Sequence, residues 1–368
     1  MNPDFLIMKK LCSPSWLFSF VVVFAFFLLG SCSGPEVKFF SADHPNFQYT
    51  GRIDFSNSEL PRFWAPGVYV QANFEGDSCV IEVNDEVLYG SNHNYISVQV
   101  DELPVQRIKL SGAHNVLKVA DGVGEGPHKL TISKSTESGI GYLEFVGLHC
   151  ENLLEPTPKS ERKIEFYGNS ITCGTGSDLS EIPCDSAQWY DQHNAFMSYG
   201  PVTARMLDAQ WMLSSVSGIG LMHSCCDMDI VMPDVYDKLN MRDNKIQWDF
   251  SEYQPDVVTV ALGQNDGIQD STEFCTRYVD FIQTLRGRYK DSKIVLLTSP
   301  MGDETLTSTM KNYLTSVSET LHKEGDENVH TFFFSRSYNN GCGGHPDLAQ
   351  HQEIAGELAG FLRSLMVW

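Results

Sequence analysis

Apolar and polar positions follow two different patterns along the chain, and the change of pattern divides it into two parts. Between residues 37 and 152, short runs alternate apolar and polar residues and are separated by Gly, Asn and Asp, as in antiparallel strands with one buried face. This spacing predicts an antiparallel β-sandwich of the jelly-roll type as the N-terminal domain. Strands are expected within residues 67–76, 78–85, 94–101, 106–112, 114–122, 128–135 and 141–148.

The second part, residues 163–368, alternates continuous apolar runs with amphipathic segments of helical period. Continuous apolar runs are typical of parallel strands that are buried on both faces. The pattern predicts a three-layer α/β domain with a parallel sheet, and residues 153–162, which include two prolines, form the expected linker. Strands are expected at 163–167, 211–216, 256–262, 293–299 and 329–334, and helices near 199–207, 274–289, 305–322 and 348–365.

The first 32 residues have the features of a bacterial lipoprotein signal peptide. Lys9 and Lys10 precede an apolar run from Trp16 to Leu29, and small residues lead into Cys32. The run is shorter than the ~20 residues that a membrane span needs. We therefore expect Cys32 to carry the lipid and the protein to lie in the bacterial cell envelope, periplasmic or cell-surface, with membrane contact through that lipid only. Plain secretion and an uncleaved anchor are the alternatives.

The net charge narrows the possible partners, and the cysteine content indicates possible disulfides. With 26 basic and 47 acidic residues, the formal net charge is −21, which argues against a nucleic-acid partner. Two of the ten cysteines fall in the leader, and an exported chain can form disulfides from the other eight. Cys173 and Cys184 are a reasonable local pair. Cys225 and Cys226 are adjacent and lie near His223, but no Cys-x-x-Cys spacing follows them, so burial or a disulfide is favoured over a metal site.

Ser170 is the candidate nucleophile of the second domain. It follows the apolar run at residues 163–167 and the turn at Gly168, so it is expected just beyond the carboxyl end of a parallel strand. Such a position places the hydroxyl at the mouth of a cleft, and the amide of the same residue is available to a developing oxyanion. Taken alone, this segment is also compatible with an ordinary strand-to-loop turn.

Three further residues follow later strands in the same way. Gly218 comes after the strand at 211–216, Asn265 follows the strand at 256–262, and His345 lies in a glycine-rich loop before the last helix. Each by itself suits a structural role, as a turn glycine, a helix cap or a structural histidine. Together with Ser170, a hydroxyl, a glycine amide, a carboxamide and an imidazole at separate strand ends form a set for acyl transfer.

These blocks resemble those of the SGNH hydrolases, a branch of the GDSL esterase/lipase superfamily. The serine block is GNSIT, the glycine block SGIG, the asparagine block GQND and the histidine block GCGGHPD. Because a β-sandwich precedes the hydrolase domain, the chain is most similar to carbohydrate esterase family 2. The resemblance implies a serine esterase that removes O-acetyl groups from plant cell-wall polysaccharides or oligosaccharides such as xylan and glucomannan, without metal or organic cofactor. It implies Ser170 and His345 as catalytic residues, with Ser170, Gly218 and Asn265 in the oxyanion hole.

The blocks depart from the usual pattern at two positions. Asn169 replaces the aspartate of the serine block, a polar exchange that we expect to be tolerated. Cys342 stands three residues before His345, where many SGNH enzymes have aspartate. The resemblance implies a Ser–His dyad, with a backbone carbonyl holding the ring N–H. Asp266 and Asp347 are disfavoured as substitutes by their spacing.

Other functions remain open from the sequence. One is an esterase of the same fold that acts on a non-carbohydrate acyl ester, and another is a non-catalytic, glycan-binding surface lipoprotein. A glycoside hydrolase is disfavoured because it needs two carboxylates at one cleft, and only Asp266 lies near the strand-end set. In the first domain, Phe63 and Trp64 are expected either to be exposed for stacking on sugar rings or to pack against the second domain.

Overall fold

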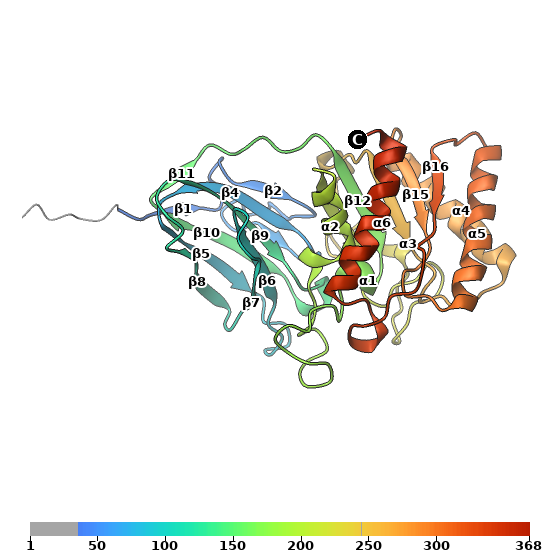
Figure 1. Ribbon diagram of the computed structural model, residues 1–368, viewed down its shortest axis with the longest axis horizontal. Helices are drawn as coiled ribbons and strands as arrows, with labels where there is room; N and C mark the ends of the chain where they lie inside the picture. Colours follow the sequence, from blue (N-terminus) through green and yellow to red (C-terminus); the bar gives the residue numbers. More distant parts are fainter. Residues whose placement is uncertain (1–35, 244) are drawn as a thin grey trace, which may run out of the picture. The chain divides into compact units, whose positions relative to one another are not determined.

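Five parallel strands form the centre of the C-terminal part of the chain (Figure 1). The computed structural model describes residues 36–243 and 245–368, so the predicted signal peptide and Cys32 lie outside the described residues. The strand order is β13-β12-β14-β15-β16, and every neighbouring pair is parallel. The strands are β12 (Lys163–Gly168), β13 (Gln210–Ser215), β14 (Val257–Ala261), β15 (Lys293–Leu297) and β16 (Val329–Phe332).

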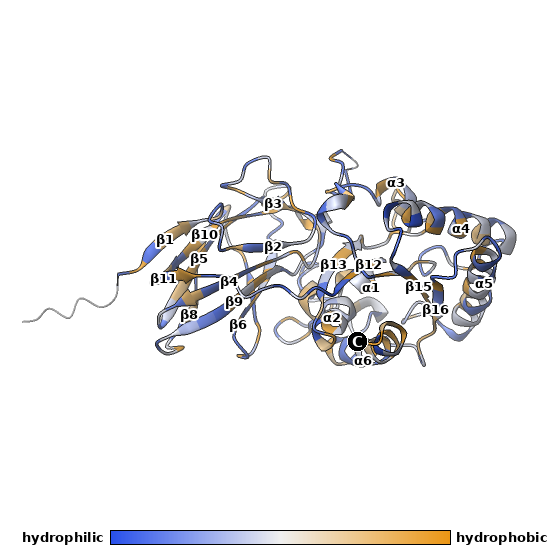
Figure 2. Cartoon of the chain, turned by 90° about the horizontal axis from the view of Figure 1, so that it is seen from above, coloured by the Kyte–Doolittle hydropathy of each residue, from blue (hydrophilic) through white to orange (hydrophobic). Residues whose placement is uncertain are grey.

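Helices cover both faces of this sheet, as Figure 2 shows. One face packs against α3, α4 and α5, and the other against α2 and α6. Side chains that alternate along β12 enter the two layers: Phe166 packs on the α2/α6 side and Tyr167 on the other. Burial on both faces explains the continuous apolar runs. The helices are α1 (Ser170–Cys173), α2 (Tyr199–Met206), α3 (Met232–Val235), α4 (Ser271–Arg288), α5 (Glu304–Lys323) and α6 (Leu348–Met366).

Aspartate side chains begin the three long helices. Asp270 accepts hydrogen bonds from the amides of the first turn of α4, and Asp303 does the same for α5. Asp347 forms a capping box with Gln350 at the start of α6. Each of these caps satisfies an amide that has no partner inside its helix, which stabilises the helix by ~1 kcal/mol.

The N-terminal part forms two antiparallel sheets that enclose a separate core, which includes Phe74, Ile81, Val98 and Leu148. The predicted fold class, a β-sandwich followed by a three-layer α/β domain, is confirmed. One sheet has the order β1-β10-β5-β8, with β3 also paired to β10; its strands are Lys38–Ser41, Leu143–Cys150, Ser78–Asp85, His114–Asp121 and Arg62–Phe63. The other has the order β11-β4-β9-β6-β7, with β2 also paired to β4; its strands are Asn152–Leu154, Tyr69–Glu75, Pro127–Lys134, Tyr95–Val100, Gln106–Lys109 and Gln48–Thr50.

Two details of the sandwich differ from the sequence prediction. Phe63 and Trp64 are 4% and 8% exposed, so neither offers a stacking surface. Phe63 belongs to the sandwich core, and the Trp64 ring lies against Tyr142 of the same domain, 5.8 Å between ring centroids. Strand β11 also extends the sandwich into the segment that the sequence predicts as linker. The sequence around Phe63 and Trp64 does not determine which face of a sheet each side chain occupies.

The sandwich packs against the α/β domain through buried polar and aromatic contacts. The Arg52 side chain is fully buried and donates hydrogen bonds to the carbonyl oxygens of Tyr236 and Lys238, both at 2.7 Å, and to Glu165 at 3.2 Å. The Trp211 ring stacks on Tyr69, with 4.0 Å between ring centroids. The two domains therefore form a continuous interface.

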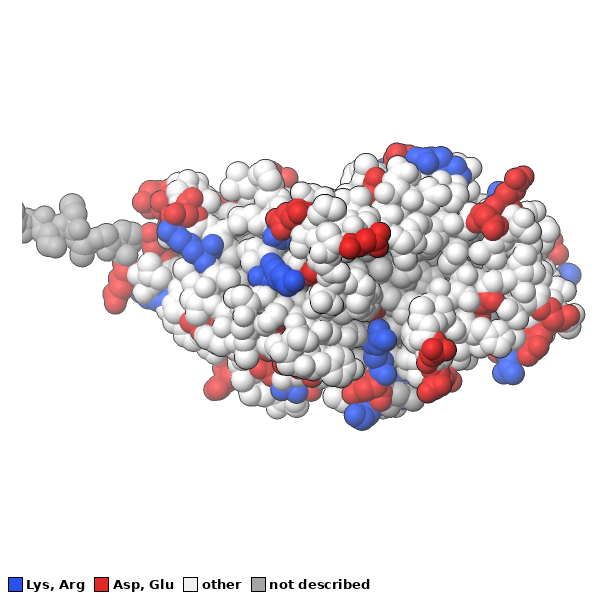
Figure 3. All heavy atoms as spheres, turned by 90° about the horizontal axis from the view of Figure 1, so that it is seen from below, with Lys and Arg blue, Asp and Glu red and all other residues white. Residues whose placement is uncertain are grey.

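The surface charge is dispersed. On the face shown in Figure 3, acidic and basic side chains are scattered among uncharged residues, without a large area of one sign.

In the described part of the chain, no helix combines the length and the apolar character that crossing a membrane requires.

Candidate active site

Ser170 lies at the junction between strand β12 and helix α1. The strand is buried in the sheet, and Ser170 is the first residue of the short helix that follows it. Asn169 caps this helix, because its side-chain oxygen accepts a hydrogen bond from the amide of Ile171 at 3.1 Å. The amide of Ser170 is therefore one of the N–H groups that the first helical turn leaves free. Asn169 keeps the acceptor that an aspartate would provide.

His345, which lies 175 residues after Ser170 in the loop before α6, contacts the serine hydroxyl. Its Nε2 lies 2.8 Å from Ser170 Oγ, a hydrogen-bond distance suited to proton transfer. Burial lowers the pKa of His345 below its ordinary value, and the hydrogen bond to the backbone oxygen of Cys342 opposes this effect. A lowered pKa keeps the imidazole neutral, and only the neutral imidazole accepts the serine proton.

The backbone of Cys342 fixes the orientation of the imidazole. The carbonyl oxygen of Cys342 lies 3.0 Å from His345 Nδ1, and the amide of Cys342 donates to the carbonyl of Gly176 at 2.8 Å. Gly176 has a φ of +65°, and a Cβ at this residue would lie 2.7 Å from the carbonyl oxygen of Cys342. The Cys342 carbonyl oxygen can occupy this position because residue 176, in the loop after Ser170, is a glycine and has no Cβ.

The disulfide predicted between Cys173 and Cys184 is wrong. Cys184 is bonded to Cys342, which is 158 residues away in sequence, and Cys173 is a buried free thiol that donates to Ser215 Oγ at 3.2 Å. Cys173 belongs to helix α1, where its side chain faces the sheet, and so it is not available to the loop that carries Cys184. Cys225 and Cys226 are bonded to each other. The Cys184–Cys342 bridge attaches the histidine loop to the loop between α1 and α2.

Gly218 and Asn265 line the same pocket as Ser170 and His345. Gly218 has a φ of +84°, and a Cβ there would lie 2.9 Å from the sulfur of Cys225, so this position requires glycine. One N–H of the Asn265 side chain donates to the carbonyl of Ile219 at 2.8 Å, which fixes the carboxamide and leaves its second N–H for another acceptor. All four predicted residues are therefore brought together.

Neither nearby aspartate takes the place of the missing acid. The Asp266 carboxylate accepts hydrogen bonds from the amides of Leu221, Met222 and His223, at 2.6–2.9 Å. Asp347 caps helix α6. Both carboxylates thus stabilise backbone segments, and the Cys342 carbonyl accepts the hydrogen bond that orients His345.

The pocket also contains residues that the sequence analysis does not single out, and three of them bear on its chemistry. The pocket has a volume of about 400 Å³, and its lining includes Trp189, whose side chain is 53% exposed, together with Arg242 and Glu137. Glu137 belongs to the sandwich domain, in which the sequence shows no grouping of chemical interest. The one signal for Trp189 in the sequence is its place as an aromatic residue in a long loop. No local pattern indicates Glu137 or Arg242. Among the described residues, no group of three or more His, Cys, Asp and Glu side chains is arranged to hold a metal ion.

Family models match both domains. Residues 49–158 match the carbohydrate esterase 2 N-terminal domain, and residues 166–350 match the GDSL-like lipase/acylhydrolase family. A solved structure of a family two carbohydrate esterase from Clostridium thermocellum, in complex with cellohexaose, is 30% identical, with a TM-score of 0.80 over 88% of this chain and 99% of that chain. The chain belongs to carbohydrate esterase family 2. The resemblance seen in the sequence blocks is thereby confirmed.

Two curated relatives of this family 2 member are also informative. The cellulase/esterase CelE of Acetivibrio thermocellus is 31% identical over 341 residues, which cover 89% of this chain and 40% of CelE, so the chain spans less than half the length of that relative. An acetylxylan esterase/glucomannan deacetylase of Cellvibrio japonicus is 28% identical over 367 residues, which cover 96% of this chain and 99% of the relative.

Proposed function

We propose that this family 2 member is a serine esterase that removes O-acetyl groups from plant cell-wall polysaccharides or oligosaccharides such as xylan and glucomannan. The observation that carries the proposal is the 2.8 Å contact between Ser170 Oγ and His345 Nε2 inside the pocket. The full-length similarity to an acetylxylan esterase/glucomannan deacetylase supports the substrate class. The exposed ring of Trp189 at the same pocket offers an apolar face to a sugar.

In the proposed reaction, His345 takes the proton from Ser170 as the serine oxygen attacks the acetyl carbonyl. The amides of Ser170 and Gly218 and the side chain of Asn265 then stabilise the negative oxygen of the tetrahedral intermediate. His345 returns the proton to the sugar oxygen, the sugar leaves as an alcohol, and an acetyl group remains on Ser170. Water, deprotonated by His345, attacks this acetyl group and releases acetate, and the proton returns to Ser170.

Acetate release from a panel of esters tests this proposal. Acetylated xylan and acetylated glucomannan are compared with aryl esters of longer acyl groups, using the wild type and Ser170→Ala. We expect the wild type to release acetate from the polysaccharides and Ser170→Ala to release none while remaining folded. A preference for long acyl groups would favour an esterase of another substrate class. Binding of the glycans without any ester cleavage would favour a non-catalytic binding protein.

We also propose that Cys32 is lipidated and that the protein is held in the cell envelope through this lipid. The basic, apolar and small-residue pattern before Cys32 supports this proposal. Growth of the expressing bacterium with a labelled fatty acid tests it: the wild type should incorporate label into the protein, and Cys32→Ser should not. Equal labelling of both, or of neither, would contradict it.

A further inference from the structure

We propose that Glu137, which belongs to the sandwich domain, is a positioning residue for the oxyanion hole of the α/β domain. This inference rests on the esterase function proposed above. It also gives the sandwich a role in the reaction, because the carboxylate acts across the domain interface. Glu137 precedes the short 3-10 turn Ser138–Ile140 between β9 and β10, and its side chain is fully buried while lining the active-site pocket.

The Glu137 carboxylate contacts the backbone beside Gly218. Its Oε2 accepts a hydrogen bond from the amide of Ser217 at 2.7 Å. On the other side, the carbonyl of Gly218 accepts a hydrogen bond from the amide of Cys225 at 2.8 Å. The peptide bond between Ser217 and Gly218 carries the N–H assigned to the oxyanion hole. Since both flanking peptide groups are held, the direction of this N–H is fixed before substrate binds.

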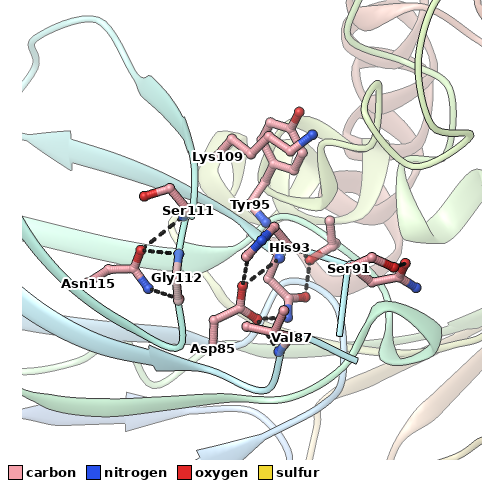
Figure 4. A network of polar contacts seen from close by, with 12 residues as sticks. Asp85, Val87, Ser91, His93, Tyr95, Lys109, Ser111, Gly112 and Asn115 are labelled. Carbon is pink, nitrogen blue, oxygen red and sulfur yellow. Dashed lines mark hydrogen bonds and ion pairs between the residues drawn. The ribbon is translucent and has the colours of Figure 1, made fainter. Parts of the chain in front are cut away.

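A polar network within the sandwich holds Glu137 in place. The buried amino group of Lys134 donates to the carbonyl oxygens of Thr136 at 2.7 Å and of Glu137 at 3.0 Å. The Thr136 hydroxyl donates to the side-chain oxygen of Asn94 at 2.5 Å, and Asn94 donates to Asp85 at 2.7 Å. Figure 4 shows Asp85 with its contacts to Val87 and His93. The loop that carries Glu137 is therefore a rigid extension of the sandwich.

Arg242 balances the buried charge of Glu137. One of its guanidinium nitrogens lies 3.1 Å from Glu137 Oε1, and its side chain is 33% exposed at the pocket. The other carboxylate oxygen remains for Ser217. A carboxylate that is paired with an arginine makes a charge-assisted hydrogen bond to the Ser217 amide, which is stronger than a bond between neutral groups.

The geometry predicts a specific order among variants of Glu137. Glu137→Gln keeps the length of the side chain and an oxygen for the Ser217 amide, whereas Glu137→Asp keeps the charge but withdraws the oxygen by one methylene. Loss of a whole oxyanion donor typically lowers kcat by ~10²–10³, so we expect Glu137→Ala to lower it by about 10- to 100-fold, because Gly218 is loosened and not removed. We expect Glu137→Gln to retain more activity than Glu137→Asp, with KM nearly unchanged in all three.

A sandwich ion pair away from the pocket provides the matched control. Glu144 accepts from Arg62 at 2.6 Å and from Asn84 at 3.0 Å, within the sandwich. Glu144→Ala should leave kcat unchanged. In Glu137→Gln the new amide group faces Arg242, so the double variant with Arg242→Ala removes this donor–donor contact and should be at least as active as Glu137→Gln alone.

The test measures kcat and KM for para-nitrophenyl acetate and acetylated xylan, with the melting temperature of each variant. The inference is supported if Glu137→Ala loses kcat at constant KM and Glu137→Gln exceeds Glu137→Asp. It is overturned if Glu137→Ala matches Glu144→Ala, or if Glu137→Asp is the more active variant. Should Glu137→Ala fail to fold, the comparison of Gln with Asp decides. A wild type without activity on either ester would instead contradict the proposed function.

Discussion

The imidazole Nδ1 of His345 donates a hydrogen bond to the backbone carbonyl oxygen of Cys342, at a distance of 3.0 Å. In many hydrolases with this fold, an aspartate carboxylate takes the place of this carbonyl. A carbonyl dipole orients the ring and selects the tautomer in which Nε2 is free to accept a proton, without adding a negative charge. The position of the carbonyl therefore matters more than the side chain of residue 342. Its position depends on the disulfide to Cys184 and on the hydrogen bond to Gly176.

The first prediction concerns pH. His345 acts as a base only when neutral, so kcat/KM should rise with pH through the pKa of His345 in the free enzyme. Burial lowers this pKa, and within residues 36–243 and 245–368 no carboxylate is hydrogen-bonded to the ring to raise it. The midpoint of the acid limb should therefore lie below the ordinary histidine value near 6.5. A kcat/KM profile of the wild type checks this, and a midpoint clearly above that value would indicate an ion-paired histidine.

The second prediction concerns the Cys184–Cys342 disulfide. Cys184→Ser removes the bond while leaving Cys342 and its carbonyl in the chain. The histidine loop should then become more mobile, which lowers kcat by about 10-fold, within the range that misplacement of a catalytic group produces. Treatment of the wild type with a dithiol reductant should have a similar effect, and Cys275→Ser, which removes a free thiol, serves as the control. Unchanged kcat in Cys184→Ser would show that the remaining contacts suffice.

The third prediction concerns the two oxyanion donors that are not part of the nucleophile. Gly218→Ala places a methyl group against the Cys225 sulfur in a backbone conformation that alanine rarely adopts. Asn265→Ala removes a donor without this strain. Both should lower kcat by ~10²–10³. For Asn265→Ala, KM should change little, and the melting temperature should stay near that of the wild type. A change in KM alone would assign Asn265 to substrate binding.

The fourth prediction concerns the domain interface. Arg52→Ala leaves Glu165 buried without its cationic partner, so it should lower the free energy of unfolding by ~3–5 kcal/mol. Arg62→Ala, which breaks an ion pair whose arginine side chain is 39% exposed, should cost about 1 kcal/mol or less. Urea unfolding of both variants measures the difference. Equal losses would mean that the buried pair has no special role at the interface.

The sequence predicts the hydrolase domain well because its signals are local. Continuous apolar runs locate all five parallel strands, and the helical period locates the four longest helices to within about three residues at either end. The blocks around Ser170, Gly218, Asn265 and His345 converge because the carboxyl ends of parallel strands meet at one edge of a sheet.

The sequence does not reveal interactions that depend on how distant segments meet. Cys184 pairs with Cys342 across 158 residues, and no spacing rule distinguishes that partner from the nearer Cys173. Glu137 reaches the pocket from another domain, so its role follows only from the packing of the sandwich against the α/β domain. The face that Trp64 occupies is likewise decided by contacts with Tyr142.

Covalent labelling of Ser170 tests the central claim most directly, namely that His345, held by the Cys342 carbonyl, activates this serine. The protein is treated with an aryl or alkyl phosphonofluoridate, and the modified peptide is identified by mass spectrometry. We expect rapid labelling of Ser170 in the wild type, none in Ser170→Ala, and strongly slowed labelling in His345→Ala. If Ser170 stays unmodified in the wild type, or reacts equally fast in His345→Ala, the proposed Ser–His mechanism is contradicted.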